Sequence, residues 1–282
     1  HYKDRHVIYG RCAHLTEIRP IYIKQGRGLC MSRRVCQRGC SLGGYFNANS
    51  TLIPWGLRTG NLTLKPNSVV HSVLYDEAQR KAVGVRVIDS FTKESQDYFA
   101  KVVFVNASTL NTNLILLNSK SNRFPNGLGN DNGLLGKYVA FHNYRATISA
   151  EYEGFPNHTI QGAKPTTHYI PRFRNVYRQE TDFLRGYAAG FQASPIRETI
   201  RDGIAGDLKK QLLETKETGV WSVGSHMMGE TIPKKSNQVK LDLEKRDNWG
   251  IPLLNIDVNY DENDEKMIQD FYQQFSEMYL KA

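Results

Sequence analysis

Alternating apolar and polar positions predict three consecutive strands in the first half of the chain. Val69–Tyr75 is rich in β-branched residues, and Ala82–Asp89 repeats valine at alternate positions. A third run extends from Asp97 to Val105, and its last four residues are apolar without interruption. Because such runs are typical of strands covered on both faces, we expect this strand to lie in a parallel sheet. A helix should follow from about Thr112.

The second half of the chain has a different pattern. Long irregular connections separate its apolar runs, which lie near residues 144–152, 187–193, 220–224 and 238–242. Strands that do not alternate with helices predict a mixed or antiparallel sheet. Helices are expected over 205–216 and from about Asp264, where one helical stripe is formed by Met267, Ile268, Phe271, Phe275 and Met278.

Together these patterns predict an α+β fold of mixed α/β character with a boundary near residue 143. Residues 1–143 should contain a β-meander followed by a helix. Residues 144–282 should contain a mainly antiparallel sheet with helices. A chain of 282 residues has room for one large domain or two ordinary ones, each with its own core.

Composition excludes few classes of function. No apolar run approaches the roughly 20 residues that a membrane helix needs, so we expect no membrane span. The net charge of +9 is scattered along the chain and no nucleic-acid motif accompanies it. It fits a solvated basic face or an anionic partner such as nucleic acid, a membrane surface or a nucleotide cofactor. The polar first residues do not form a signal peptide, and localisation stays open between cytoplasm and periplasm.

Two local patterns suggest chemistry. The third apolar run ends in the small polar residues Asn106-Ala107-Ser108 before the helix, and α/β folds bind the phosphates and ribose of nucleotides at such junctions. A plain structural turn is the alternative.

In addition, three of the four cysteines, Cys30, Cys36 and Cys40, lie within eleven residues. Cysteines spaced this closely favour a metal or cofactor neighbourhood over a disulfide framework; isolated zinc with Cys12 or His14, and purely structural cysteines, are also consistent.

Three segments in order resemble the glucose-methanol-choline (GMC) family of FAD-dependent oxidoreductases. Residues 39–54 are similar to the family's Gly-Cys-x-x-Gly-Ala segment and the helix after it. Residues 70–107 resemble its meander and following strand, and residues 114–142 resemble its leucine-rich helix and the loop that ends in histidine. Near the carboxyl end, residues 237–242 and 247–252 are similar to the family's substrate domain.

The resemblance implies an enzyme that oxidises the CH–OH group of a sugar or another alcohol by hydride transfer to FAD. Residues 1–143 would then be part of the FAD-binding domain, and residues 144–282 the substrate-binding domain. The expected partners are the small-molecule substrate and an electron-transfer partner, with no nucleic acid. The alternatives are a non-catalytic nucleotide-binding module of the same fold and a basic nucleic-acid-binding protein.

By the same resemblance, the backbone of Val70 would hold the adenine edge. Asn106, Ala107 and Ser108 would lie near the ribose and pyrophosphate, and His142 would also contact the cofactor. Some bacterial dehydrogenases of this family carry an iron–sulfur cluster on a closely spaced cysteine trio, so Cys30, Cys36 and Cys40 could serve as its ligands.

The chain also departs from the family pattern. The family shows Ala-Gly-Ala where this chain has Asn106-Ala107-Ser108, and an acid where it has Phe141. No Gly-x-Gly-x-x-Gly fingerprint is present, and His226, despite a similar His-x-Met-Gly context, precedes the position of the family's catalytic histidine. We therefore expect an internal segment that contains no catalytic residue, is inactive alone and binds FAD weakly or not at all.

Overall fold

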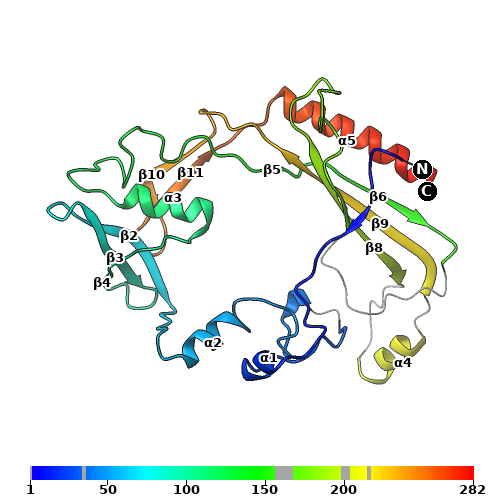
Figure 1. The fold of residues 1–282 in the computed structure, drawn as a ribbon, viewed down its shortest axis with the longest axis horizontal. Helices are drawn as coiled ribbons and strands as arrows, with labels where there is room; N and C mark the ends of the chain where they lie inside the picture. The colour runs from blue at the N-terminus through cyan, green and yellow to red at the C-terminus, as the bar shows by residue number, and fades with distance from the viewer. Residues whose placement is uncertain (1, 34–35, 156–167, 198–203, 215–216) are drawn as a thin grey trace. The chain divides into compact units, whose positions relative to one another are not determined.

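The computed structural model describes residues 2–33, 36–155, 168–197, 204–214 and 217–282. In these residues, helices and antiparallel sheets form an α+β structure, which confirms the predicted class (Figure 1). The structure divides into two compact units that interleave along the sequence. The sheet unit comprises residues 1–63, 142–231 and 261–282, and the meander unit comprises residues 64–141 and 232–260.

The meander unit contains a three-stranded antiparallel sheet in the order β2 (Ser68–Asp76), β3 (Lys81–Asp89) and β4 (Ser95–Phe99). A Cβ atom on Gly84 of β3 would lie 2.2 Å from the carbonyl oxygen of Tyr98, so only glycine allows β4 to approach here. The strands predicted over 69–75 and 82–89 are confirmed.

The helix α3 (Ser108–Asn118) packs against β2, and a buried serine joins the two. Ser119 Oγ accepts a hydrogen bond from Val73 N at 2.8 Å and donates one to Ile115 O at 2.6 Å. The helix predicted near this position is confirmed, although it begins before residue 112. The hairpin of β10 (Gln238–Arg246) and β11 (Pro252–Asp257) belongs to the same unit.

The third predicted strand is only partly right. β4 ends at Phe99, and the residues up to Val105 are not in a strand. Val102 and Phe104 are 65% and 82% exposed, so the expectation of a buried strand in a parallel sheet is wrong. Every strand pair in the described ranges is antiparallel. Ala100 N still donates to Val83 O of β3 at 2.9 Å, but no described strand pairs with residues 101–105.

The sheet unit is built on a six-stranded antiparallel sheet. Its strands are β1 (Ile8–Tyr9), β5 (His142–Asn143), β6 (Thr147–Tyr152), β7 (His168–Ile170), β8 (Tyr187–Arg197) and β9 (Glu217–Glu230). The order is β1-β7-β8-β9-β5, and β6 also pairs with β9. The long β9 therefore pairs with three strands, β5, β6 and β8. The prediction of an antiparallel sheet in this half is confirmed.

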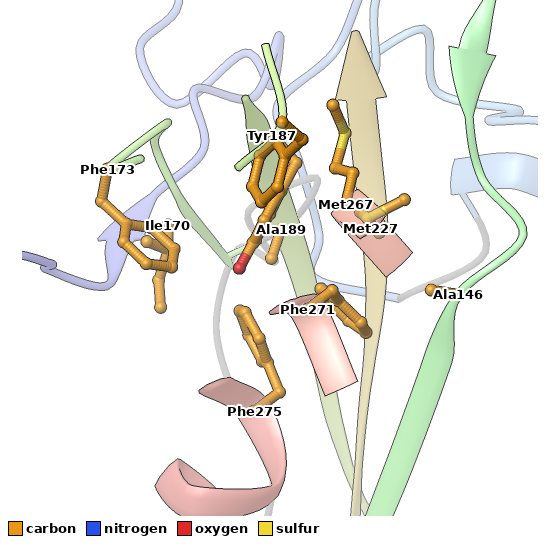
Figure 2. Packing of buried hydrophobic residues seen from close by; sticks show 10 residues of the cluster. Ala146, Ile170, Phe173, Tyr187, Ala189, Met227, Met267, Phe271 and Phe275 are labelled. Atoms are coloured by element: carbon orange, nitrogen blue, oxygen red, sulfur yellow. The ribbon is translucent and has the colours of Figure 1, made fainter. Parts of the chain in front are cut away.

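The helix α5 (Glu262–Lys281) covers one face of this sheet. It begins with a capping box in which Asp261 accepts from Asp264 N and the Asp264 side chain accepts from Asp261 N. Met267, Phe271 and Phe275 on the predicted stripe have no exposed surface and pack against β8 and β9 (Figure 2). Burial of each phenylalanine contributes roughly 2–3 kcal/mol.

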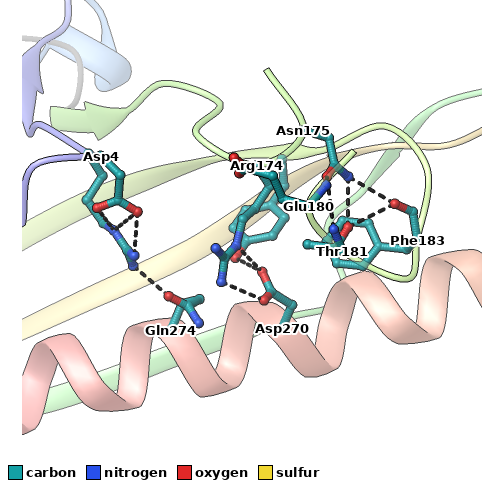
Figure 3. A network of polar contacts seen from close by, with 10 residues as sticks. Asp4, Arg174, Asn175, Glu180, Thr181, Phe183, Asp270 and Gln274 are labelled. Atoms are coloured by element: carbon teal, nitrogen blue, oxygen red, sulfur yellow. Dashed lines mark hydrogen bonds and ion pairs between the residues drawn. The ribbon is translucent and has the colours of Figure 1, made fainter. Parts of the chain in front are cut away.

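A polar network ties the loop before β8 to the same helix (Figure 3). The Arg174 guanidinium donates to both carboxylate oxygens of Asp270 at 2.9 and 3.0 Å, and Tyr187 Oη donates to Asp270 at 2.6 Å. Burial and the neighbouring Asp270 carboxylate raise the pKa of Tyr187 well above its usual value. The network therefore keeps the buried phenol protonated and hydrogen-bonded.

Short elements complete the sheet unit: α1 (Pro20–Lys24), the 3₁₀ turn Cys36–Arg38, α2 (Leu52–Arg58) and α4 (Gly206–Glu214). Among the described helices, none combines the length and apolar character that a bilayer crossing requires. The chain passes from the meander unit to the sheet unit between residues 141 and 142, but residues 1–63 belong to the sheet unit and residues 232–260 to the meander unit. The assignment of residues 1–143 to FAD and 144–282 to substrate stays a prediction.

Candidate functional site

A cleft of about 410 Å³ lies in the meander unit, where the chain leaves β4 and approaches α3. Its lining residues come from β2, β3, β4 and α3, and from residues 100 and 102–107 between β4 and the helix. The cleft is lined by Val70, Val73, Gly84, Val85, Tyr98, Phe99, Ala100, Val102, Val103, Phe104, Val105, Asn106, Ala107 and Ile115. Three of the predicted site residues, Val70, Asn106 and Ala107, are therefore brought together although 36 positions separate the first two.

Val70 occupies an edge strand. Among the described strands, only β3 pairs with β2, so the outer edge of β2 carries backbone groups that no strand pairs with. The register shifts between Val70 and Ser72, which makes His71 a bulged residue beside the cleft. Bulges re-aim neighbouring groups and are common next to binding sites. This edge can present backbone donors and acceptors to a flat heterocycle.

His71 is expected to be neutral at pH 7. Burial lowers its pKa, and the nearby Arg86 guanidinium lowers it further. Its Nδ1 atom lies 3.0 Å from Ser72 Oγ. The edge of the cleft therefore gains no positive charge from this histidine near neutral pH.

The amino-terminal end of α3 follows directly on the cleft residues. Ala107 is the N-cap residue and forms no side-chain capping hydrogen bond. Ser108, the first residue of the helix, has a φ of 64°, a left-handed conformation that is strained for any residue except glycine. Uncapped N–H groups at a helix start attract anions, so this junction is suited to a phosphate. Ser108 does not line the cleft itself.

One wall of the cleft is apolar and open. Phe99, Val102 and Phe104 are each at least 65% exposed although all three line it. Large apolar side chains that remain exposed mark surfaces that bind a ligand or another protein segment. The sequence does not indicate this exposed wall, because an uninterrupted apolar run is also the pattern of a buried strand.

His142 belongs to the sheet unit, where it pairs with Glu230 across β5 and β9. Its ring meets the ring of Tyr144 edge-on at 5.5 Å. It does not line the cleft of the meander unit, and its contact with a cofactor stays a prediction.

A second surface lies on the sheet face that α5 leaves uncovered. Met227 packs into the core under α5, so its neighbour His226 points to the opposite face. The His226 ring lies over Gly190, where a Cβ atom would be 2.4 Å from the ring, and it stacks with Tyr144 at 6.1 Å. The alternation of Ser225, His226 and Met227 could have indicated this orientation, but no sequence signal identified Tyr144.

The cysteines lie in the sheet unit around a small cavity of about 30 Å³. Cys30, Cys36 and Cys40 line it together with His14. Burial, followed by the neighbouring Cys30, raises the pKa of the Cys36 thiol. In the described part of the chain, no three His, Cys, Asp or Glu side chains are arranged to hold a metal ion. The cavity brings the three predicted cysteines together, and the iron–sulfur or zinc site stays a prediction.

Comparison with known proteins gives a family match for part of the chain. Residues 20–142 match the GMC oxidoreductase family. The chain is 30% identical to 2-methyl-1,2-propanediol dehydrogenase of Mycolicibacterium austroafricanum over 65% of its length, which covers 34% of that protein. It is 24% identical to the fructose dehydrogenase large subunit of Gluconobacter japonicus over 84% of its length, which covers 42% of that protein. The chain thus spans about a third to two fifths of these relatives.

Proposed function

We propose that this chain, whose residues 20–142 belong to the GMC oxidoreductase family, forms one wall of the FAD site and the substrate side of a flavin-dependent oxidoreductase. The whole enzyme would oxidise the CH–OH group of a sugar or a small polyol. The observation that supports this most directly is the cleft that joins Val70, Asn106 and Ala107 inside the matched segment.

The described residues fit the adenosine half of FAD. The cleft offers an open strand edge for the adenine, an apolar wall for its ring, and an uncapped helix start for a phosphate. We propose that the Val70 backbone binds the adenine edge and that Asn106, Ala107 and Ser108 lie along the ribose and pyrophosphate. Small side chains at Ala107 and Ser108 permit close approach. By the family resemblance alone, we propose His142 as a further cofactor contact.

When bound, FAD supplies the hydride acceptor for alcohol oxidation. The proposed contribution of this chain is to bind and orient FAD and the substrate. The proposal assigns no catalytic base to it, and His226 serves the substrate surface rather than proton transfer.

The substrate surface is proposed to be the uncovered face around His226, Tyr144 and Gly190. Gly190 leaves room for a flat imidazole, and a Cβ atom added at Gly224 would have no heavy atom within 4 Å. A stacked ring pair with ring N–H and hydroxyl groups can hold a polyhydroxy compound through apolar contact and hydrogen bonds. The two relatives are named for a diol and for fructose, which favours this substrate class. An electron-transfer partner is part of the same proposal, since one relative is named as a subunit.

Flavin content of the intact enzyme tests the proposal. Ala107→Trp would fill the cleft, and we expect retained FAD to fall at least about tenfold, equivalent to 1.4 kcal/mol of binding free energy. Ala78→Trp, in the exposed turn between β2 and β3, is the matched control and should keep its flavin. Both variants are purified with excess FAD, and released flavin is measured per chain.

Turnover is measured on the same preparations with fructose and 1,2-diols as substrates and a reducible dye as acceptor. Flavin loss in Ala107→Trp alone, with turnover lost in parallel, supports the proposal. Wild-type protein without flavin, or full flavin retention in Ala107→Trp, would overturn it.

A further inference from the structure

Acidic residues are absent from one long stretch of the chain. Basic residues occur along its whole length, but residues 18–75 contain no aspartate or glutamate. Residues 76–282 contain equal numbers of basic and acidic residues, so the net charge of +9 comes from residues 1–75. The basic residues of the acid-free stretch are Arg19, Lys24, Arg27, Arg33, Arg34, Arg38, Arg58 and Lys65. This part of the chain therefore carries a positive charge that its own sequence does not neutralise.

Two short helices of this stretch lie next to each other in the sheet unit. Nη1 of Arg58, the last residue of α2, donates a hydrogen bond to the carbonyl oxygen of Lys24, the last residue of α1, at 2.9 Å. A Cβ atom on Gly26 would lie 3.3 Å from the same guanidinium. Residues 18–27 and 52–58 therefore form one surface, which we call the α1–α2 surface.

The α1–α2 surface exposes aliphatic side chains. Ile18, Ile21 and Ile23 are 42%, 47% and 63% exposed. Leu52 and Leu57 of α2 are 59% and 46% exposed, and neither helix contains a buried residue. Aliphatic side chains that gather on one exposed surface mark a place where another molecule binds.

The positive charge of this surface is oriented but not neutralised. Arg27 Nε donates to Gly43 O at 2.9 Å, and its guanidinium lies over the Tyr22 ring at 5.4 Å. A carbonyl oxygen and an aromatic ring carry no net charge, so these contacts fix the guanidinium and leave its charge in place. Arg19 pairs with Glu17 at 3.5 Å, but the two side chains are 62% and 72% exposed, so this pair is weak.

We infer that the α1–α2 surface binds the anionic surface of a phospholipid bilayer. Its basic residues would attract the headgroups, and its isoleucines would enter the boundary between headgroups and acyl chains. Protein interfaces depend on aromatic and arginine anchors and are poor in energetically important leucines, whereas the large exposed apolar side chains here are all aliphatic. Tyr22 and Trp55, which are half-buried on α1 and α2, are residue types enriched at membrane interfaces. The inference is independent of the proposed flavin chemistry.

Vesicle binding of the intact enzyme tests this inference. Vesicles of phosphatidylcholine with about 30 mol% phosphatidylglycerol are compared with vesicles of phosphatidylcholine alone. We expect the enzyme to sediment with the anionic vesicles only. Raising the salt concentration from about 0.05 M to about 0.5 M should lower the bound fraction at least about fivefold, because salt screens the attraction between charges.

Two variants of the surface separate its charge from its apolar contact. Lys24→Glu should weaken vesicle affinity at least about tenfold, because a positive charge is replaced by a negative one. Ile23→Ser should weaken it at least about threefold, because less apolar surface enters the bilayer.

Each variant has a matched control in the meander unit. Lys120→Glu makes the same charge change at an exposed position, and Ile256→Ser removes an isoleucine that is 51% exposed. Both controls should bind vesicles as wild type does. Turnover in solution and thermal unfolding should be unchanged in all four variants, since none of the replaced side chains is buried.

Three outcomes would overturn the inference. One is the absence of binding to anionic vesicles, which would mean that another part of the enzyme covers the surface. Another is an effect of Lys24→Glu or Ile23→Ser no larger than that of its control. The third is tighter binding to duplex DNA than to anionic vesicles of equal total charge, which would assign the surface to nucleic acid.

Discussion

The two units differ in the exposure of their apolar segments. In the sheet unit, the stripe on α5 meets the strands β8 and β9, and Met267, Phe271 and Phe275 lose all their exposed surface. In the meander unit, the equally apolar stretch from Val102 to Phe104 stays open at the rim of a cleft. Apolar sequence alone therefore does not make a core, because burial also needs a partner surface.

Two arginine–aspartate pairs with nearly identical geometry also differ in burial between the units. Arg174 and Asp270 in the sheet unit, and Arg86 and Asp97 in the meander unit, each form two hydrogen bonds of 2.9–3.0 Å. The side chains of the first pair are 19% and 15% exposed, and those of the second 48% and 31%. The difference in burial should decide what each pair contributes to stability.

The largest effect is expected from Phe271→Ala. The side chain has no exposed surface and stacks on Phe275 at 4.4 Å, so its removal leaves a cavity under the sheet. The free energy of unfolding should fall by about 3–5 kcal/mol. Phe91→Ala is the matched control, because Phe91 is 77% exposed and should change stability by less than about 0.5 kcal/mol. Urea denaturation measures both, and similar losses would contradict the assigned core.

A smaller effect is expected from Asp270→Asn. The substitution leaves the Arg174 guanidinium without its carboxylate in a partly buried place and weakens the acceptor for Tyr187 Oη, at a cost of about 2–3 kcal/mol. Asp97→Asn removes a pair of the same geometry but should cost less than about 1 kcal/mol. Thermal unfolding compares the two, and equal costs would show that burial does not distinguish them.

The smallest effect on stability is expected from Phe104→Ser. Because this side chain is 82% exposed, the free energy of unfolding should change by less than about 0.5 kcal/mol. We expect the isolated chain to self-associate through its exposed apolar wall, and Phe104→Ser should decrease this association because it removes part of that wall. Sedimentation velocity measures the second effect. A large loss of stability would mean that Phe104 is buried in solution.

The candidate site was predictable in part. The motif resemblance placed Val70 beside Asn106 and Ala107, and the cleft contains all three. The open wall could not be predicted, because the pattern of Val102–Val105 does not say whether a strand will cover it. The same limit applies to His226: its strand was evident, but its ring contacts depend on Gly190, which lies 36 positions earlier.

Local patterns in the sequence determined the elements themselves. The β-branched alternation specified β2 and β3, and the helical stripe from Met267 to Phe275 specified α5 and its buried face. These features follow from backbone geometry and side-chain periodicity over a few residues, so no distant contact is needed to predict them.

Tertiary structure decided which distant residues meet. It brought residues 232–260 to the meander unit, directed the imidazole of His14 to Cys12 and Cys36, and left the stretch after β4 unpaired. Each of these outcomes depends on the pairing of segments far apart in the chain. The physical reason is that periodicity specifies which face of an element is apolar, whereas only packing specifies what covers that face.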